Sequence, residues 1–266
     1  MSLIKMIRIA AILIVFSIFS ACFCTINIVA EDSFSWYCKR TCDHAQPPLP
    51  AEFEFIYDYG GVYIDKANSD PLAKTKKIYL TFDAGYENGN ISKTLDVLKK
   101  NEVKGSFFIL SNLIKTSPEI VIRMANEGHI VCNHTSNHKD MSKITDTESF
   151  NKEINELEQK YYELTGREVS KFFRPPEGKF NVRTLSMAKS AGYKTVFWSF
   201  AYADWDNNSQ MSHEKAKEKI LSNIHNGAIL LLHPTSSTNA AILESVIIEL
   251  KEQGYTFETL DNLSDL

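Results

Sequence analysis

Net charge is small in this sequence, and this excludes one class of protein. The 266 residues include 29 lysines and arginines against 33 aspartates and glutamates, which gives a formal net charge of −4. A protein that binds nucleic acid presents a basic patch to the phosphates. Because no basic excess is visible, we expect no nucleic-acid partner.

Cysteine is also scarce. Of the five cysteines, Cys22 and Cys24 lie in an apolar N-terminal run and Cys132 lies in a strand candidate. This leaves Cys38 and Cys42, and two cysteines are too few for a structural zinc site, which needs four ligands. Outside the cell this pair could form a small disulfide, and two free thiols in a flexible segment is the alternative.

The first 30 residues have the pattern of a targeting segment. Two basic residues near the N-terminus precede an uncharged, mostly apolar run over 9–30. We therefore predict a signal peptide or an uncleaved membrane anchor over 1–30. Cleavage after Ala30, lipoprotein-type processing at Cys22 and retention in the bilayer all stay open. Each fate places the rest of the chain outside the cytoplasm, at the outer face of the membrane or in the cell-wall space.

The rest of the chain divides into two parts by composition. Residues 31–54 are rich in aromatic and charged side chains and have two adjacent prolines near their end, so we interpret them as an N-terminal arm. Residues 55–266 are enough for one α/β barrel-sized domain, which we predict to be the catalytic domain.

Strand and helix signals alternate along this second part. Helix candidates begin at capping residues and end at glycines, as expected. Four of them run from Ser117 to Gly128, from the capping box of Thr145 and Glu148 to Gly166, from Asn181 to Gly192, and from Ser212 to Gly227. Another lies over 91–100, and a last one ends at Gly254. Short apolar strand candidates lie between them, at 78–82, 106–110, 129–132, 171–173, 194–200, 228–232 and 255–257. Short connections of this kind predict parallel strands, hence an α/β fold. We expect an irregular, incomplete β/α barrel, and an open doubly wound sheet is the alternative.

Chemically active side chains follow five of these strands, each just past the strand's end. They are Asp83, the pair His134 and His138, Arg174, Asp204, and His233. Each alone has an ordinary structural explanation, such as a satisfied core histidine for His233. The carboxyl ends of parallel strands meet at one end of a barrel, and active sites lie there, whereas packing would scatter these residues over both ends. We therefore expect them to form one site.

The first part of this set suits metal-assisted hydrolysis. If the loop after the third strand turns helical, His134 and His138 fall on one face, and two neutral imidazoles suit zinc or another divalent ion. Such an ion polarises a carbonyl and lowers the pKa of bound water. Asp83 can take the proton from that water, and Arg174 can hold Asp83 ionised.

The remaining two residues supply an acid. His233 can donate a proton to a leaving group, and Asp204 can raise its basicity or fix its tautomer. Base, acid and metal around one carbonyl predict hydrolysis of an amide or an ester.

These residues lie in motifs that resemble those of the polysaccharide deacetylases, the family 4 carbohydrate esterases. Residues 81–85, Thr-Phe-Asp-Ala-Gly, resemble the family's T-F-D-D-G, and residues 134–138 resemble its H-[ST]-x-x-H. Residues 174–176, 204–205 and 230–233 are similar to its third, fourth and fifth motifs. All five occur in order, and the resemblance covers most of the chain after the arm.

The resemblance implies a fold and a reaction. The fold is a distorted, incomplete (β/α)7 barrel. The reaction is metal-dependent removal of acetyl groups from N-acetylated sugars, with Asp83 as base and His233 as acid. The implied substrate-binding residues are Pro176, Glu177, Trp205 and Asn88, with the backbone N–H of Glu177 binding the oxyanion.

Two departures from the family pattern stand out. Ala84 replaces a metal-binding aspartate, so either His134 and His138 hold the ion with waters, or Asp83 becomes a ligand. Glu177 replaces the usual aromatic residue after the third motif.

Ala84 and the run Gly-Tyr-Glu-Asn-Gly at 85–89 give this stretch a sequence that resembles the peptidoglycan N-acetylmuramic acid deacetylases of spore-forming bacteria. That likeness implies peptidoglycan glycan strands as substrate and muramic δ-lactam of spore cortex as the final product. It also implies a functional link to a cell-wall amidase, which removes the stem peptide, and a location in the intermembrane space of the developing spore. The freed lactyl carboxylate would need polar or cationic partners, for which the candidates are Lys179, Arg183, Asn88 and Asn90.

Other functions stay open. An N-acetylglucosamine deacetylase would share every motif. An inactive glycan-binding barrel is a second alternative, with Ala84 as the mark of a lost metal site. A glycosidase needs two carboxylates at a defined separation, and Asp83 with Glu87 is a poor candidate pair.

Overall fold

The structure, a computed structural model, describes residues 33–41 and 44–264. The predicted targeting segment and Cys42 lie outside these residues. Cys38 lies within them as a free thiol whose Sγ donates to the carbonyl oxygen of Ser199 at 2.9 Å. Burial raises the pKa of this thiol to about 11, against the opposing effect of Arg40. Over the described ranges, no helix combines the length and apolar character that crossing a membrane requires.

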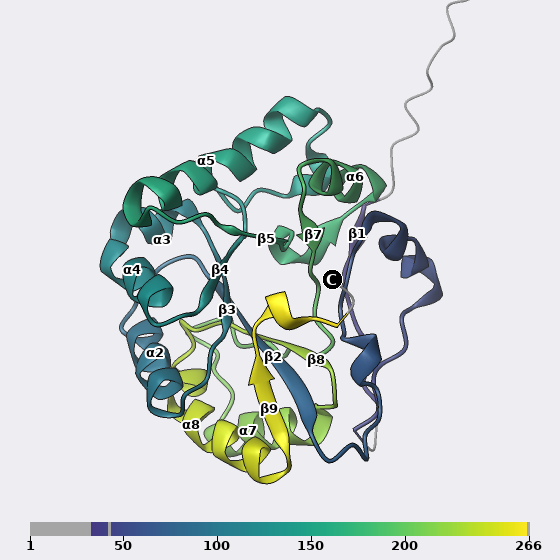
Figure 1. The fold of residues 1–266 in the computed structure, drawn as a ribbon, viewed down its shortest axis with the longest axis vertical. Coiled ribbons are helices and arrows are strands. Elements are labelled where there is room, and N and C mark those ends of the chain that lie inside the picture. Colours follow the sequence, from purple (N-terminus) through teal and green to yellow (C-terminus); the bar gives the residue numbers. More distant parts are fainter. Residues whose placement is uncertain (1–32, 42–43, 265–266) are drawn as a thin grey trace, which may run out of the picture. The chain divides into compact units, whose positions relative to one another are not determined.

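A curled sheet of seven parallel strands forms the centre of the fold (Figure 1). The order is β7-β5-β4-β3-β2-β8, with β9 also paired to β2. The strands are β2 (Lys76–Ala84), β3 (Ser106–Ile109), β4 (Ile130–Asn133), β5 (Ser170–Phe173), β7 (Lys194–Thr195), β8 (Ala228–Leu232) and β9 (Tyr255–Glu258). The prediction of an incomplete β/α barrel is confirmed, and the open doubly wound alternative is wrong.

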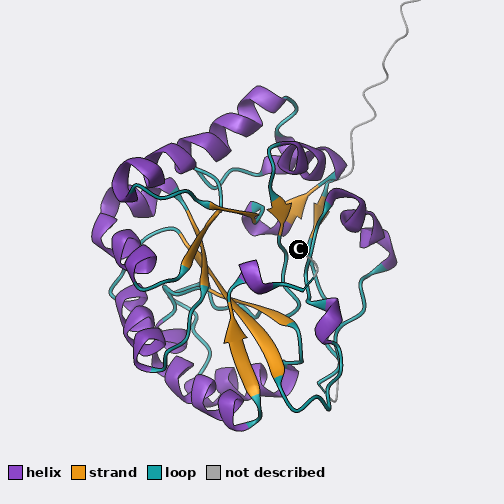
Figure 2. Ribbon diagram, in the orientation of Figure 1, coloured by secondary structure: helices purple, strands orange, loops and turns teal. Residues whose placement is uncertain are grey.

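Helices cover the outside of this half-barrel (Figure 2). They are α2 (Asn90–Lys100), α3 (Ser111–Thr116), α4 (Pro118–Asn126), α5 (Thr147–Thr165), α6 (Val182–Ser190), α7 (His213–Asn223) and α8 (Ser237–Glu252). Because each helix returns the chain to the start of the next strand, every strand points the same way. All carboxyl ends therefore meet at one end of the barrel.

β2 shows how the sequence sorts side chains between the two faces of the sheet. Successive residues of a strand point to opposite faces. Ile78, Leu80 and Phe82 pack in the large core beneath the helices, whereas Tyr79 packs in a second core inside the barrel. Asp83 follows the register of Tyr79, so it faces the barrel interior at the strand's carboxyl end.

The C-terminal segment closes the opposite mouth of the barrel. Leu260 and Leu263 pack inside it, and the backbone N–H of Leu260 donates to Oγ of Ser106, the first residue of β3. The amino ends of the strands are thereby covered, while the carboxyl ends stay open to a site.

Three predicted boundaries are wrong. Asp146, rather than the Thr145 and Glu148 box, caps α5, because its carboxylate accepts from the backbone N–H of Ser149 at 2.7 Å. The strand over 194–200 shortens to β7, because the residues after it pair only through isolated bridges.

The third wrong boundary is the end of α7. The helix ends at Asn223, four residues before the predicted glycine. His225 follows it as a fully buried ring that hydrogen bonds to the carbonyl oxygen of Asn226 and to Oγ of Ser199, both at 2.9 Å. These bonds hold the chain in an extended path.

The segment interpreted as an arm packs into the folded unit instead. β1 (Phe34–Ser35) pairs antiparallel with β6 (Lys179–Phe180), and Trp36 is 6% exposed. Trp36 stacks on Phe197 with ring centroids 4.3 Å apart. Aromatic side chains bury large apolar areas, so a segment rich in them is stabilised on the barrel rather than left as a linker.

This N-terminal segment also fills the opening between β7 and β8. After the 3₁₀ helix η1 (Ala51–Tyr59), Val62 forms a bridge with Val196 and Ile64 forms one with Ala228. Further along, Phe200 bridges directly to Leu230. Isolated bridges thus complete the ring that regular strands leave open.

Candidate active site

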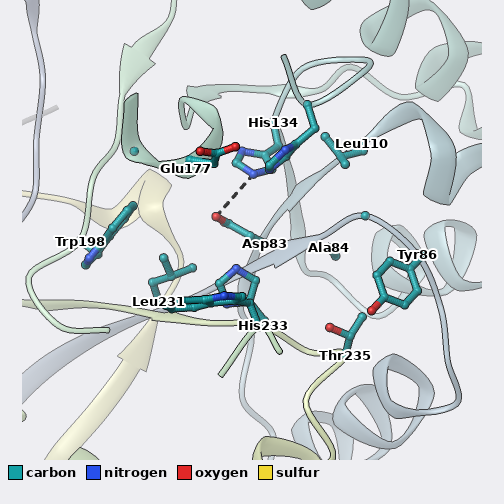
Figure 3. A pocket seen from close by; sticks show the side chains of 14 residues that line it. Asp83, Ala84, Tyr86, Leu110, His134, Glu177, Trp198, Leu231, His233 and Thr235 are labelled. Carbon is teal, nitrogen blue, oxygen red and sulfur yellow. Dashed lines mark ion pairs between the residues drawn. The ribbon is translucent and has the colours of Figure 1, made fainter. Parts of the chain in front are cut away.

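A cavity of about 840 Å³ opens at the carboxyl ends of the strands. Its lining includes the predicted residues Asp83, His134, His138, Glu177, Trp205 and His233 (Figure 3). These come from the ends of β2, β4, β5, β7 and β8, so the structure brings together residues that are far apart in the chain.

Arg174 holds Asp83 from inside the barrel. Its guanidinium is fully buried, lies 4.1 Å from the ring centroid of Phe108, and donates to Oδ1 of Asp83 at 2.8 Å. A further bond to Oγ1 of Thr81 at 3.0 Å fixes its orientation. Burial alone would raise the pKa of Asp83, but the charges of Arg174 and nearby histidines lower it overall. Asp83 is therefore an ionised carboxylate with one oxygen bound and the other facing the cavity.

His134 and His138 lie side by side, but not on a helix. Their ring centroids are 5.1 Å apart, and the loop between them has no helical turn. Thr135 and His138 instead have left-handed backbones, with φ of 75° and 55°. The helical turn that would place the two histidines on one face is not formed, and the two imidazoles meet without it.

His134 has a defined tautomer. Its Nδ1–H donates to the carbonyl oxygen of Arg174 at 2.8 Å, and its Nε2 lies 3.6 Å from Oδ2 of Asp83, the pair joined by the dashed line in Figure 3. Burial lowers the pKa of His134 to about 4, against the opposing effect of Asp83. At neutral pH the ring is uncharged, with a lone pair on Nε2.

A buried glutamate that the sequence did not reveal holds this loop. Glu153 of α5 is 2% exposed. Its backbone oxygen accepts from the N–H of Ser136 at 2.9 Å, and its carboxylate accepts from the N–H of Asn137 at 3.0 Å. The left-handed residues are stabilised by these bonds, because such conformations cost free energy in isolation.

His233 and Asp204 form a second pair on another wall. The Nδ1–H of His233 donates to Oδ1 of Asp204 at 2.7 Å, and the backbone N–H of His233 donates to Oδ2 at 2.8 Å. Asn239 also donates to Oδ2, at 2.5 Å. Burial would lower the pKa of His233, but the bond to Asp204 and the charges of Asp204 and Asp83 raise it overall. His233 is thus suited to carry a proton on Nε2 into the cavity.

The predicted substrate-binding residues differ in position. Trp205 and Glu177 line the cavity, and the Glu177 backbone has a left-handed φ of 57°. Pro176 is buried beside Glu177 but does not line the cavity. Asn88 instead donates to the carbonyl oxygen of Thr235 at 2.8 Å, which ties two loops together.

Several cavity residues were missed because no local signal marks them. Tyr86, Leu110, Trp198 and Thr235 line the cavity but belong to no catalytic pattern. Tyr86 belongs to the run at 85–89 that marks the subgroup resemblance, but that resemblance assigned it no role.

The side chains of His134, His138 and Asp83 offer some of the ligands that a divalent metal ion needs. A metal-binding imidazole usually donates its other N–H to a carbonyl or carboxylate, and His134 does this with Arg174. His138 lies beside it, and Asp83 is the neighbouring carboxylate. Ala84 is fully buried and offers no donor. Within residues 33–41 and 44–264, no group of three or more His, Cys, Asp or Glu side chains is close enough to enclose an ion.

An ionised carboxylate and a histidine of raised pKa line one cavity, an arrangement that suits hydrolysis by a base and an acid. The family pattern described as polysaccharide deacetylase matches residues 71–196. Peptidoglycan-N-acetylmuramic acid deacetylase PdaA of Bacillus subtilis is 38% identical over 236 residues, which are 88% of this chain and 87% of that protein.

One more relative and one solved structure belong to the same class of enzyme. A peptidoglycan-N-acetylglucosamine deacetylase of Bacillus cereus is 33% identical over 90% of this chain and 79% of that protein. The solved structure of Bacillus subtilis PdaA, described as a family 4 carbohydrate esterase, superposes with a TM-score of 0.81 over 87% of this chain and 97% of that one.

The chain belongs to the polysaccharide deacetylase family, the family 4 carbohydrate esterases. It is a carbohydrate N-deacetylase, and the resemblance of its motifs is confirmed. Enzymes of this family are generally metal-dependent.

Proposed function

We propose that this protein removes the acetyl group from N-acetylmuramic acid in peptidoglycan. The observation that carries the proposal is the arrangement of Asp83, held by Arg174, and His233, held by Asp204, around one cavity. The similarity to PdaA over nearly the whole of both chains supports the choice of substrate.

The two pairs divide the reaction between base and acid. Asp83 accepts a proton from the water that attacks the acetyl carbonyl carbon, and Arg174 keeps the carboxylate ionised for this step. His233 donates its Nε2 proton to the amide nitrogen as the C–N bond breaks, and Asp204 stabilises the imidazolium before transfer. Acetate and a free amine on the sugar are the products.

A divalent ion, which we propose is zinc, would be held by His134 and His138 with Asp83 as the neighbouring carboxylate. When bound, such an ion polarises a carbonyl and lowers the pKa of water. The neutral state of His134 at physiological pH, caused by burial, supports this assignment, because a metal binds the unprotonated ring.

Recognition of muramic acid requires a partner for the lactyl carboxylate. Of the described residues that line the cavity, none is lysine or arginine. Lys179 does not line the cavity itself, but its Nζ pairs with the cavity-lining Glu177 at 2.6 Å. Arg183 donates instead to the carbonyl oxygens of Ser142 and Ile144. Lys179 pairs with Glu177 and, at 3.9 Å, with Asp140, but an ammonium has three donors, so we propose Lys179 as the partner of this carboxylate.

Asn88 and Asn90 are less suited to that role. The side-chain amides of both donate to the carbonyl oxygen of Thr235, at 2.8 and 3.0 Å. One donor of each amide is thereby engaged within the protein.

A biological setting follows from this substrate. We propose that the enzyme is exported, that it acts on strands from which an amidase has removed the stem peptides, and that the new amine closes on the lactyl carboxylate to give the muramic δ-lactam of spore cortex.

The test is mass spectrometry of glycan strands incubated with the zinc-loaded enzyme, with and without prior amidase treatment. The expected result is that muramic acid loses its acetyl group in amidase-treated strands, and that untreated strands lose none. Acetyl loss confined to glucosamine would instead support N-acetylglucosamine deacetylation, which similarity to the Bacillus cereus relative favours.

A further inference from the structure

Two aromatic side chains on the rim of the cavity remain exposed although the protein holds both in place. Tyr86, in the loop after β2, is 46% exposed, and Trp205, in the loop after β7, is 61% exposed. Both line the cavity. Exposed aromatic rings next to a cavity are typical of binding surfaces, because they offer apolar area at little cost in side-chain entropy.

The loop that carries Tyr86 is anchored at its base. The side-chain amides of Asn88 and Asn90 both donate to the carbonyl oxygen of Thr235, which follows β8. The backbone that presents Tyr86 is thereby fixed to a neighbouring strand end.

The ring itself is held from across the cavity rim. Nδ2 of Asn207 donates to the hydroxyl oxygen of Tyr86 at 2.7 Å. Asn207 belongs to the same loop as Trp205. Gln210 braces that loop by donating to two of its backbone carbonyls, at 2.9 and 2.7 Å. Tyr86 and Trp205 are thus joined into one preorganised surface, and preorganisation lowers the cost of binding.

The two rings lie at different places on the rim of the cavity. Trp205 lies beside the acid, with its ring centroid 6.3 Å from that of His233. Tyr86 lies on the other side of the cavity from Glu177 and Trp198, past His233 and next to Thr235 (Figure 3). We take the sugar that contacts Tyr86 to be a neighbour of the sugar whose acetyl group reacts.

We propose that Tyr86 forms a second sugar-binding site, in which its ring stacks on the pyranose that adjoins the reacting one and belongs to the next disaccharide unit, and that Asn207 positions the ring. A pyranose has an apolar face of C–H groups, which matches the flat face of a tyrosine ring. The ligand class is an oligosaccharide longer than two sugars. The identity of that ligand as a glycan strand rests on the proposed function.

Calorimetric titration with peptide-free peptidoglycan disaccharide and tetrasaccharide tests this site. Wild type is expected to bind the tetrasaccharide more tightly. Tyr86→Ala should weaken tetrasaccharide binding about tenfold, the effect of one aromatic anchor, and disaccharide binding by a smaller factor. Tyr162→Ala, which removes an exposed tyrosine of α5, is the matched control and should change neither.

The positioning role of Asn207 has its own signature. Tyr86→Phe and Asn207→Ala remove the same hydrogen bond, so each should weaken tetrasaccharide binding by the same factor, and the double variant by no more than either. Tyr86→Leu keeps apolar bulk without a flat ring and should behave like Tyr86→Ala.

Two results would overturn the second site: wild-type affinity of Tyr86→Ala for the tetrasaccharide, or equal losses for both lengths. Binding needs no turnover, so this comparison decides the matter even if wild type releases no acetate from peptidoglycan, a result that would overturn only the proposed function.

Discussion

Asp83 has two roles at the level of the single residue, because it faces both the cavity and a buried guanidinium. Asp83→Asn should reduce acetate release by at least roughly 10²–10⁴-fold, since an amide cannot accept the proton of water. It should also lower the melting temperature, because Arg174 loses its counter-charge inside the barrel. Acetate release and thermal unfolding measure the two effects separately.

The matched control is Asp96→Asn, which removes an exposed carboxylate paired with Arg123. This surface ion pair contributes little, so both measurements should stay near those of the wild type. Retained turnover in Asp83→Asn would show that the base is elsewhere.

The pKa of His233 gives a second prediction at this scale. Asp204 raises that pKa above the ordinary value of 6.5, so activity that needs protonated His233 persists above pH 6.5 and falls as pH rises through the raised pKa. Asp204→Asn keeps a hydrogen-bonding side chain but removes the charge. The falling limb of the pH–activity profile should therefore move to lower pH.

The two profiles would be measured as acetate release from glycan strands between pH 5 and 10 at saturating zinc. An unmoved limb in Asp204→Asn would mean that His233 is not the group that titrates.

At the scale of elements, α5 positions the two histidines through Glu153. Glu153→Ala should leave the N–H of Asn137 without its buried acceptor, at a cost of about 1–3 kcal/mol, and loosen the loop between His134 and His138. We expect weaker zinc binding and an activity loss that excess zinc partly restores.

Zinc affinity measured by competition with a chelator, alongside activity, checks this expectation. Glu163→Ala, an exposed change on the same helix, is the control and should alter neither quantity. Unchanged zinc affinity in Glu153→Ala would remove Glu153 from any role in the metal site.

The same elements show what the sequence could predict. Asp83 and His233 were found because each directly follows an apolar strand, and strand ends are visible in the sequence. Glu153 was not found, because it lies in a helix interior and acts through contacts that only the folded chain makes. The path of the loop after β4 could not be predicted for the same reason: tertiary hydrogen bonds stabilise the left-handed backbones of Thr135 and His138.

The N-terminal segment was misread as an arm on similar grounds. Its aromatic residues have no helix or strand period, so composition alone suggested a linker. Their role depends on partners such as Phe180 and Phe197, which come from much later in the chain.

At the scale of the whole molecule, Trp36 links the N-terminal segment to the cavity wall. Its indole N–H donates to the carbonyl oxygen of Trp198 at 2.9 Å, and its backbone N–H donates to that of Gly178 at 2.8 Å. Trp36→Ala should cost about 3–5 kcal/mol of unfolding free energy and also reduce activity, because Trp198 and Gly178 line the cavity.

Urea unfolding and acetate release test this prediction together. Tyr37→Ala is the control, since Tyr37 is the next residue and is 43% exposed. Its loss should be well under that of Trp36→Ala. Equal losses in the two variants would argue that the segment is not part of the folded unit.

β2 stands early in the chain, yet two of its three partner strands, β8 and β9, come last. Val62 and Ile64 likewise pair with Val196 and Ala228, which come much later in the chain. Pairings between distant residues are slow to form, because the chain loses the entropy of closing a long loop before any contact stabilises it. A chain emerging from its N-terminus therefore exposes the unpaired edge of β2 and its apolar side chains until nearly all of it has been synthesised. Asp83 meets His233 only at that final stage, so a partly made chain has no active site and needs protection from aggregation.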